Sequence, residues 1–148
     1  MTTSSASRPV TVRCPFCSQL NRVDLALLDH GPKCGGCARP LLLDRPVKAT
    51  GQDFDQTIGT SVVPILVDFY ADWCGPCRMM APAIDQLAAD RMGQVLVLKV
   101  DTDRDPELSQ RFGIRGIPTL IAFHGGKEIG RHVGMAGRAD LDRLVSVP

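Results

Sequence analysis

The chain has 148 residues, of which 44% are hydrophobic and 22% charged, and its formal net charge is +1. These values are typical of a soluble globular protein with one ordinary domain, or one domain beside a very small one. No apolar run approaches the length of about 18 residues that a membrane span requires. Residues 1–48 carry seven Lys and Arg against three Asp, but the basic residues are scattered and Phe16 is the only aromatic among them, so nucleic-acid binding is not expected.

The first ten residues are rich in Thr and Ser and lack an apolar core. This composition argues against a secretory signal. It predicts a flexible tail over residues 1–9 and makes the cytoplasm the expected location.

Residues 10–45 predict a small separate module. Val10–Arg13 and Leu41–Leu43 are short strand-like runs within it. A segment of this length buries too little apolar surface to fold alone, so a bound metal would supply the missing stability. Arg45–Pro46 marks its boundary, and residues 46–148 are then the second domain.

Six cysteines form three Cys-x-x-Cys pairs: Cys14/Cys17, Cys34/Cys37 and Cys74/Cys77. Where no signal peptide is expected, metal binding and redox chemistry explain such pairs better than a disulfide framework does. The first two pairs are sixteen residues apart, and together their four sulfurs can complete a tetrahedron around one ion. A closed, structural zinc site is favoured, with iron, disulfides or no metal as alternatives. His30 could replace one sulfur, but a surface position explains it more simply.

From Val47 onward strands alternate with helices. Continuous apolar runs predict buried strands, 3.6-residue spacing predicts helices, and Gly125–Gly126 predicts a hairpin. The predicted elements are an edge strand at 47–50, a helix at 52–58, a strand at 65–70, a helix at 74–91, a strand at 95–100, a helix at 106–112, strands at 119–124 and 127–132, and a helix at 139–145. The order predicts an α/β fold with a central mixed sheet flanked by helices.

The third cysteine pair lies where a buried strand is followed by a helix. The first turn of a helix has free N–H groups and the positive end of the helix dipole. Both lower the pKa of a thiol at Cys74 and make it the nucleophile. Cys77 lies one turn further along the same face, so Cys74 can attack a substrate disulfide and Cys77 can resolve the mixed disulfide. A structural or metal-binding pair is the alternative.

Two charged residues interrupt the two buried strands. Asp68 lies within 65–70 and Lys99 within 95–100. Burial should raise the pKa of Asp68, so that it can accept a proton near neutral pH. If the strands are neighbours, the two side chains can pair. The alternatives are a polar residue at a strand edge for Asp68 and a lysine that reaches solvent for Lys99.

From Val47 onward the sequence resembles the thioredoxin family over about 100 residues. The matching motifs are Val67-Asp68-Phe69-Tyr70-Ala71, Trp73-Cys74-Gly75-Pro76-Cys77, Pro82, and Gly113-Ile114-Arg115-Gly116-Ile117-Pro118-Thr119. Tyr70 stands where many members have tryptophan, and since an aromatic ring is retained, we expect little chemical consequence. With the four-cysteine module in front, the chain resembles the zinc-containing thioredoxin-2 type of bacteria, which is associated with oxidative stress.

The resemblance implies a thioredoxin fold preceded by a zinc-ribbon-like module, with a redox-sensitive zinc. It implies reduction of protein disulfides with electrons from NADPH through thioredoxin reductase, without a bound organic cofactor. The sequence does not show the oligomeric state, and a monomer is the default expectation. Asp68 would assist Cys77 through a proton, with Lys99 tuning it, and Pro118 would be cis. The substrate-binding residues would be Trp73, Gly75, Pro76, Ile117, Pro118 and Gly134.

Gly75 and Pro76 place no charge between the cysteines, which favours a reductase over an oxidase. Two other functions are open to the sequence: a binding module whose ribbon docks partners, and a chaperone that holds unfolded proteins when zinc is lost.

Overall fold

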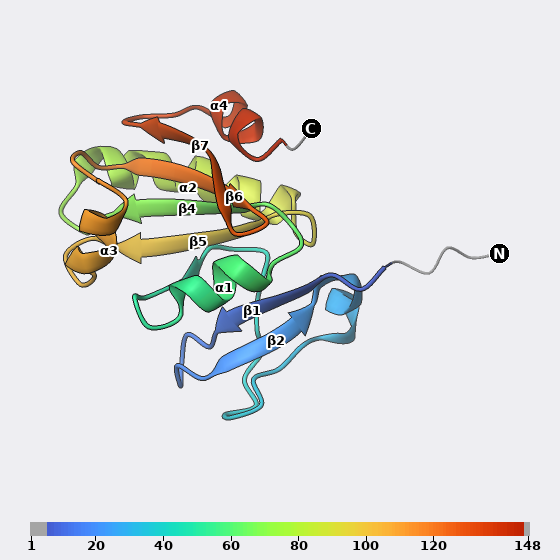
Figure 1. Cartoon of the computed structure of the whole chain (residues 1–148). Helices are drawn as coiled ribbons and strands as arrows, with labels where there is room; N and C mark the ends of the chain where they lie inside the picture. The colour runs from blue at the N-terminus through green and yellow to red at the C-terminus, as the bar shows by residue number, and fades with distance from the viewer. Residues whose placement is uncertain (1–5, 147–148) are drawn as a thin grey trace.

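A computed structural model describes residues 6–146, and a five-stranded mixed sheet forms the centre of its larger part (Figure 1). The strand order is β3-β5-β4-β6-β7; β3, β5 and β4 run parallel, and β6 and β7 are antiparallel to their neighbours. The strands are β3 (Val47–Lys48), β4 (Ile65–Tyr70), β5 (Leu96–Asp101), β6 (Thr119–His124) and β7 (Lys127–Val133).

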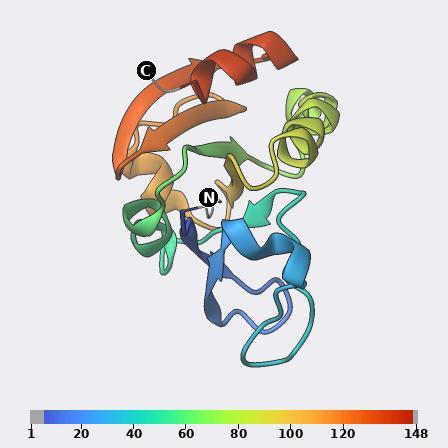
Figure 2. The ribbon, with the colours of Figure 1, turned by 90° about the vertical axis from the view of Figure 1, so that its right-hand side faces the viewer.

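Four helices cover the two faces of this sheet. Figure 2 shows α1 and α3 on one face and α2 on the other, with α4 beside α2. The helices are α1 (Phe54–Thr60), α2 (Gly75–Asp90), α3 (Pro106–Arg111) and α4 (Arg138–Leu144). All nine elements expected from residue 47 onward are therefore present, with ends within two residues of the prediction. Pro82 lies inside α2 without ending it.

The front module contains a two-stranded antiparallel sheet and a short 3-10 helix. These are β1 (Pro9–Arg13), β2 (Leu20–Asp24) and η1 (Leu25–His30). The prediction of a strand at Leu41–Leu43 is wrong: β1 takes Leu20–Asp24 as its partner. Pro40, which has no N–H to donate to a ladder, precedes the leucines. The true partner was missed because Asn21 and Arg22 interrupt its apolar pattern.

The residues before β1 are held by Asp24. Its carboxylate accepts hydrogen bonds from the backbone N–H of Arg8 (2.8 Å) and from the hydroxyl of Ser7 (3.0 Å). Pro9 already belongs to β1. Of the tail expected over residues 1–9, residues 1–5 lie outside the described part of the chain.

The module and the sheet share one hydrophobic core. Val10, Val12 and Val23 of the module belong to the same cluster of buried side chains as Phe54 and Ile58 of α1. A second cluster lies between the sheet and the α2–α4 layer. The module is thereby packed against α1, below the sheet in Figure 1.

Polar contacts fix the same junction. Arg13 donates to Asp53, next to α1, at 3.0 Å, and Thr60 bonds to Thr11 at 3.2 Å. Asp53 is only 2% exposed, so Arg13 compensates a buried charge. The position of the module against the sheet therefore depends on specific partners as well as on apolar packing.

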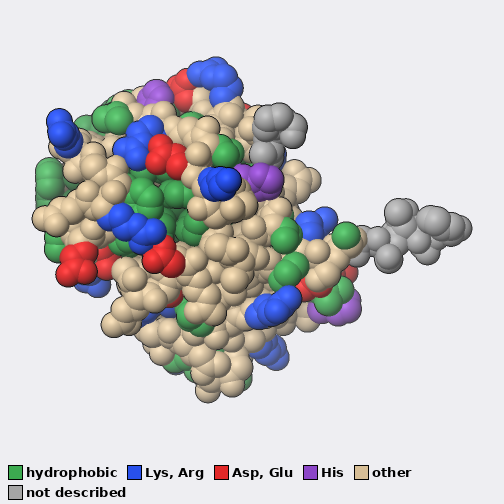
Figure 3. All heavy atoms as spheres, in the orientation of Figure 1, with side chains coloured by type: hydrophobic (Ala, Val, Ile, Leu, Met, Phe, Trp, Pro, Cys, Tyr) green, Lys and Arg blue, Asp and Glu red, His purple; other side chains and the backbone are tan. Residues whose placement is uncertain are grey.

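The surface carries mixed charge. On the face in Figure 3, basic and acidic side chains lie next to one another. Ion pairs of this kind include Arg111–Asp55 and Arg131–Glu128. Among the helices of residues 6–146, none combines the length and apolarity needed to cross a bilayer.

Candidate active site and metal centre

Cys74 and Cys77 lie at the start of α2, directly after β4. Cys74 is the N-cap residue of the helix, and its sulfur accepts a hydrogen bond from the backbone N–H of Cys77 at 3.2 Å. The two residues form a disulfide, with Cα atoms 5.2 Å apart. When the pair is reduced, the same N–H and the helix dipole would stabilise a thiolate on Cys74.

The loop before β6 lies against this pair. The sulfur of Cys74 is 3.8 Å from the carbonyl oxygen of Ile117, and the Ile117–Pro118 bond is cis, as the resemblance implies. Gly134 donates its N–H to the carbonyl of Pro118 at 2.8 Å. The fold therefore brings residues from three separate segments together beside the sulfur of Cys74.

Trp73 forms one wall of an open cleft next to the disulfide. Its ring is on the surface, at 67% exposed, and its Nε1–H donates to Asp103 at 2.8 Å. The cleft has a volume of about 330 Å³, and its lining also includes Ile114 and Ile117. An apolar surface held in place in this way can receive an extended segment around a substrate disulfide.

Asp68 is buried on the α2 side of the sheet. It is 2% exposed, and its Oδ1 atom has no hydrogen-bond partner among the described residues. Burial raises the pKa of this carboxyl to about 6; the charge of Lys99 opposes the rise, and that of Asp85 adds to it. Asp68 can therefore exchange a proton close to neutral pH.

Lys99 is the register partner of Asp68 on the neighbouring strand. The two side chains nevertheless form no ion pair within 4 Å in the described structure. The Lys99 ammonium instead lies over the ring of Tyr70, 4.3 Å from its centroid. The strands are neighbours, but the possible pairing of Asp68 with Lys99 is not a direct contact: Lys99 makes a cation–π contact with Tyr70 and acts on Asp68 only through its charge.

The four front cysteines converge on one point. Their sulfur atoms all lie within 4.8 Å of one another. The contact between Cys14 and Cys37 is 3.7 Å, and that between Cys17 and Cys34 is 3.4 Å. A tetrahedral ion with metal–sulfur bonds of about 2.3 Å requires sulfur–sulfur distances of about 3.8 Å, so the spacing fits one metal ion.

The two halves of this site repeat one local geometry. The backbone N–H of Cys14 donates to the carbonyl of Gln19, and the backbone N–H of Cys34 donates to the carbonyl of Arg39, each at 2.9 Å. Directly after each Cys-x-x-Cys, Ser18 and Ala38 adopt a left-handed conformation, with φ of 69° and 65°. Each turn therefore bends its two sulfurs to the same side, which is the chelating arrangement of a zinc ribbon.

Donors around the sulfur of Cys34 favour its ionised form. The backbone N–H of Gly36 donates to the sulfur of Cys34 at 3.3 Å, and the side-chain amide of Asn21 donates to it at 3.4 Å. The backbone N–H of Cys37 and the Asn21 amide are the main causes that lower the pKa of Cys34, to about 6. Metal ligation needs thiolates, so these donors suit the site to a cation.

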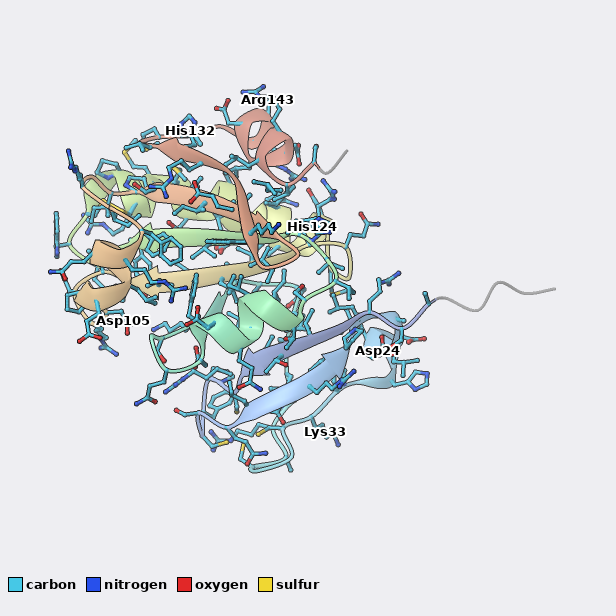
Figure 4. All side chains as sticks on the ribbon, in the orientation of Figure 1. Asp24, Lys33, Asp105, His124, His132 and Arg143 are labelled. Carbon is cyan, nitrogen blue, oxygen red and sulfur yellow. A yellow bond between two sulfur atoms is a disulfide. The ribbon has the colours of Figure 1, made fainter. Side chains whose placement is uncertain are left out.

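The histidines take no part in this cluster. Among the described residues the cluster consists of the four cysteines alone. His30 lies on the surface near Asp29, and His124 and His132 lie apart on the β6–β7 hairpin (Figure 4).

Sequence reasoning missed three residues that support these sites. Asp103 holds the indole of Trp73, Asn21 bonds to a cysteine sulfur, and Arg13 bridges the module to Asp53. Each acts on a residue 13 to 40 positions away. No local pattern marks such partners. The one available signal was Asn21, a polar residue at a strand position that is buried.

Two protein-family profiles match this chain. The thioredoxin family profile matches residues 45–146, and the profile "Thioredoxin 2, N-terminal", a zinc ribbon, matches residues 13–39. Thioredoxin C-3 of Corynebacterium nephridii is 38% identical over 130 residues, which are 88% of this chain and 89% of that protein. Thioredoxin 1 of a Nostoc species is 44% identical over 98 residues, 66% of this chain and 92% of that protein.

Two further relatives differ in kind. A bifunctional thioredoxin reductase/thioredoxin of Mycobacterium leprae is 41% identical over 100 residues, 68% of this chain but 22% of that protein. A solved mutant thioredoxin of Halobacterium salinarum has a TM-score of 0.65 and 33% identity, covering 73% of this chain and 98% of that one. With its thioredoxin fold, its front zinc ribbon and the Cys74–Cys77 pair at the start of α2, this chain belongs to the thioredoxin family and is a protein-disulfide reductase.

Proposed function

We propose that Cys74 is the attacking thiolate of this reductase and Cys77 the resolving thiol. The observation that carries this assignment is the N-cap position of Cys74, whose sulfur accepts the backbone N–H of Cys77. Cys77 lies within the first turn, where its sulfur is bonded to that of Cys74. Only the sulfur of Cys74 therefore gains from the free N–H groups at the helix start.

The exchange runs in two balanced steps. The Cys74 thiolate forms a bond to one substrate sulfur, and the substrate disulfide breaks to release the other sulfur as a thiolate that takes up a proton. Cys77 then loses its proton and attacks the Cys74 sulfur, which releases the first substrate sulfur. The substrate gains two electrons, and the protein is left with the Cys74–Cys77 disulfide.

Asp68 accepts the proton that Cys77 loses, and Lys99 tunes this transfer. Support comes from the burial of Asp68, whose pKa is raised to about 6, and from its unpartnered Oδ1 atom. Asp68 precedes the cysteines on β4, while Lys99 lies opposite it on β5. A water molecule can carry the proton between the carboxyl and the sulfur.

A groove beside Cys74 binds the substrate segment. Its members come from the active-site turn and the two facing loops, and the hydrogen bond from Gly134 to Pro118 supports their grouping. The exposed ring of Trp73 supplies apolar contact area. The proposed set is Trp73, Gly75, Pro76, Ile117, Pro118 and Gly134.

The four front cysteines, Cys14, Cys17, Cys34 and Cys37, bind a structural Zn²⁺. Four protein thiolates leave no open position on the ion, so it stabilises the ribbon and takes no part in catalysis. Oxidation of these thiolates would release the metal and loosen the ribbon. We assign residues 10–45 to this module and residues 46–148 to the thioredoxin domain.

The reductase works in the cytoplasm as a monomer and is recharged from NADPH by thioredoxin reductase, without a bound organic cofactor. The fusion of a thioredoxin reductase with a thioredoxin in Mycobacterium leprae supports this partner. A role in oxidative-stress defence follows if the zinc site responds to oxidants. Disulfide-containing proteins are the substrates.

Reduction of insulin by the full chain, with thioredoxin reductase and NADPH, tests the assignment. We expect Cys74→Ser to reduce no insulin, because the nucleophile is gone. Cys77→Ser should instead accumulate a mixed disulfide through Cys74, detected by mass spectrometry. A mixed disulfide through Cys77 in the Cys74→Ser variant, at the rate seen in Cys77→Ser, would reverse the two roles.

A further inference from the structure

A second cavity lies between the zinc ribbon and the thioredoxin domain, near the C-terminal end of β5, where Asp105 is labelled in Figure 4. Its volume is about 240 Å³. The ribbon supplies Arg13, Pro15 and Ser18, and the thioredoxin domain supplies the remaining walls. The lining residues used below are Lys48, Tyr70, Lys99, Asp101, Arg104 and Asp105.

Three hydrogen-bond donors of this cavity have no protein acceptor among residues 6–146. Lys48 and Lys99 are register partners on β3 and β5, so both side chains lie on the same face of the sheet. Neither ammonium has a carboxylate within 4 Å in the described structure. The hydroxyl of Tyr70 also makes no hydrogen bond there, although the residue is only 7% exposed.

The negative groups of the cavity are already engaged. Asp101 accepts a hydrogen bond from the backbone N–H of Asp103 (3.0 Å) and lies 3.7 Å from Arg104. Asp105 accepts the backbone N–H of Gly51 at 2.9 Å. Arg13 is paired with Asp53 outside the cavity lining. Lys48, which is exposed, and Lys99, which is half-buried, therefore carry like charges on neighbouring strands of the cavity wall, and a bound anion would offset both.

Tyr70 adds a neutral donor to these two cations. Burial, with Asp101 and Asp72 nearby, raises the pKa of Tyr70 above its ordinary value, so the hydroxyl keeps its proton. Tryptophan, which many family members have at this position, would present no hydroxyl. The expectation that Tyr70 has little chemical consequence considered only its ring.

We propose that this cavity binds a small oxyanion such as phosphate, held by Lys48, Lys99 and the hydroxyl of Tyr70. An oxyanion offers several acceptor oxygens, which suits a cavity whose lining supplies two ammonium groups and one hydroxyl. The ribbon closes one side of the cavity through Arg13, Pro15 and Ser18.

Such an anion would also act on the reaction, and this second effect rests on the proposed role of Asp68. Lys99 stands between the cavity and Asp68, and its positive charge lowers the pKa of that carboxyl. An anion beside Lys99 offsets this charge and raises the pKa further, in the same direction as burial and Asp85. Tyr70 is the other titratable group whose charge interaction with Asp68 is resolved. Occupancy should therefore shift the pH profile of resolution to higher pH.

Calorimetric titration of the oxidised, zinc-loaded full chain with inorganic phosphate tests the site, with sodium chloride at equal ionic strength as the reference. We expect saturable binding that Lys48→Ala weakens about ten-fold, because a charged hydrogen bond is lost. Tyr70→Phe keeps the ring under Lys99 and should weaken binding about five-fold. Lys127→Ala, on the far edge of the sheet, is the matched control and should bind phosphate as the wild type does.

Two results would overturn the site: heat no greater than that of chloride, or equal weakening by Lys127→Ala and Lys48→Ala. For the coupling, phosphate at a concentration that half-saturates the wild type should raise the pH midpoint of its single-turnover insulin reduction, and at the same concentration should raise that of Lys48→Ala much less. Phosphate binding with no change in the wild-type midpoint would overturn the coupling. If the protein reduced no insulin even in the absence of phosphate, the proposed reductase roles would be refuted, whereas phosphate binding measured by calorimetry would stand. Failure of the proposed function and failure of the proposed site are therefore distinguishable.

Discussion

Replacing Asp68 by Asn should change the stability of the folded protein in a pH-dependent way that favours the variant at high pH. The pKa of Asp68 is raised from 3.8 to about 6 on folding, so between these values the folded state binds more protons than the unfolded state. Stability contributed by the neutral carboxyl is present below pH 4 and is lost as the pH rises through 6. A rise of about two pKa units corresponds to about 3 kcal/mol.

The measurement is the free energy of unfolding of oxidised wild type and Asp68→Asn in guanidinium chloride, at pH 8 and pH 4. Any pH-independent cost of the buried amide is the same at both values and cancels in the comparison. Apart from that constant cost, we expect the free energy of unfolding of the variant to exceed that of the wild type by about 3 kcal/mol at pH 8 and by less than about 1 kcal/mol at pH 4. The exposed Asp72→Asn is the control and should change stability by less than about 0.5 kcal/mol at either pH. Equal effects of Asp68→Asn at pH 4 and pH 8 would refute the reasoning that burial perturbs this carboxyl.

Two further predictions concern the zinc ribbon and its attachment. Arg13→Ala removes a donor from the buried carboxylate of Asp53 and should lower the free energy of unfolding by about 2 kcal/mol. The control, Arg22→Ala at an exposed position, should lower it by less than about 0.5 kcal/mol. Equal losses in the two variants would contradict a specific junction between ribbon and sheet. Cys17→Ser or chelation should release one zinc per chain, measured by metal analysis, and should abolish hydrogen-exchange protection in β1 and β2 before β4 and β5. Unchanged protection of β1 and β2 in the zinc-free chain would show that the metal does not hold the ribbon.

Much of the fold followed from local patterns. The run Ile65–Tyr70 is buried at every position and is a strand at the predicted bounds. The roles of the cysteine pairs could be predicted from their spacing alone, because two cysteines three residues apart can bring their sulfurs together within one turn of the chain or at the start of a helix. Residues 20–24 escaped prediction because Asn21 has a polar side chain yet is buried, where its amide bonds to a cysteine sulfur.

The sequence by itself determined the strand–helix order, the position of Cys74 at a helix start and the four-cysteine metal pattern, because each depends on residues a few positions apart. Only the tertiary structure decided which partners the charged side chains contact. It turned Lys99 onto Tyr70 instead of Asp68, joined Arg13 to Asp53 and left a cavity between ribbon and sheet. Such contacts join residues that are distant in the chain. The partner of a long, flexible side chain such as lysine or arginine therefore depends on which groups the fold places near it.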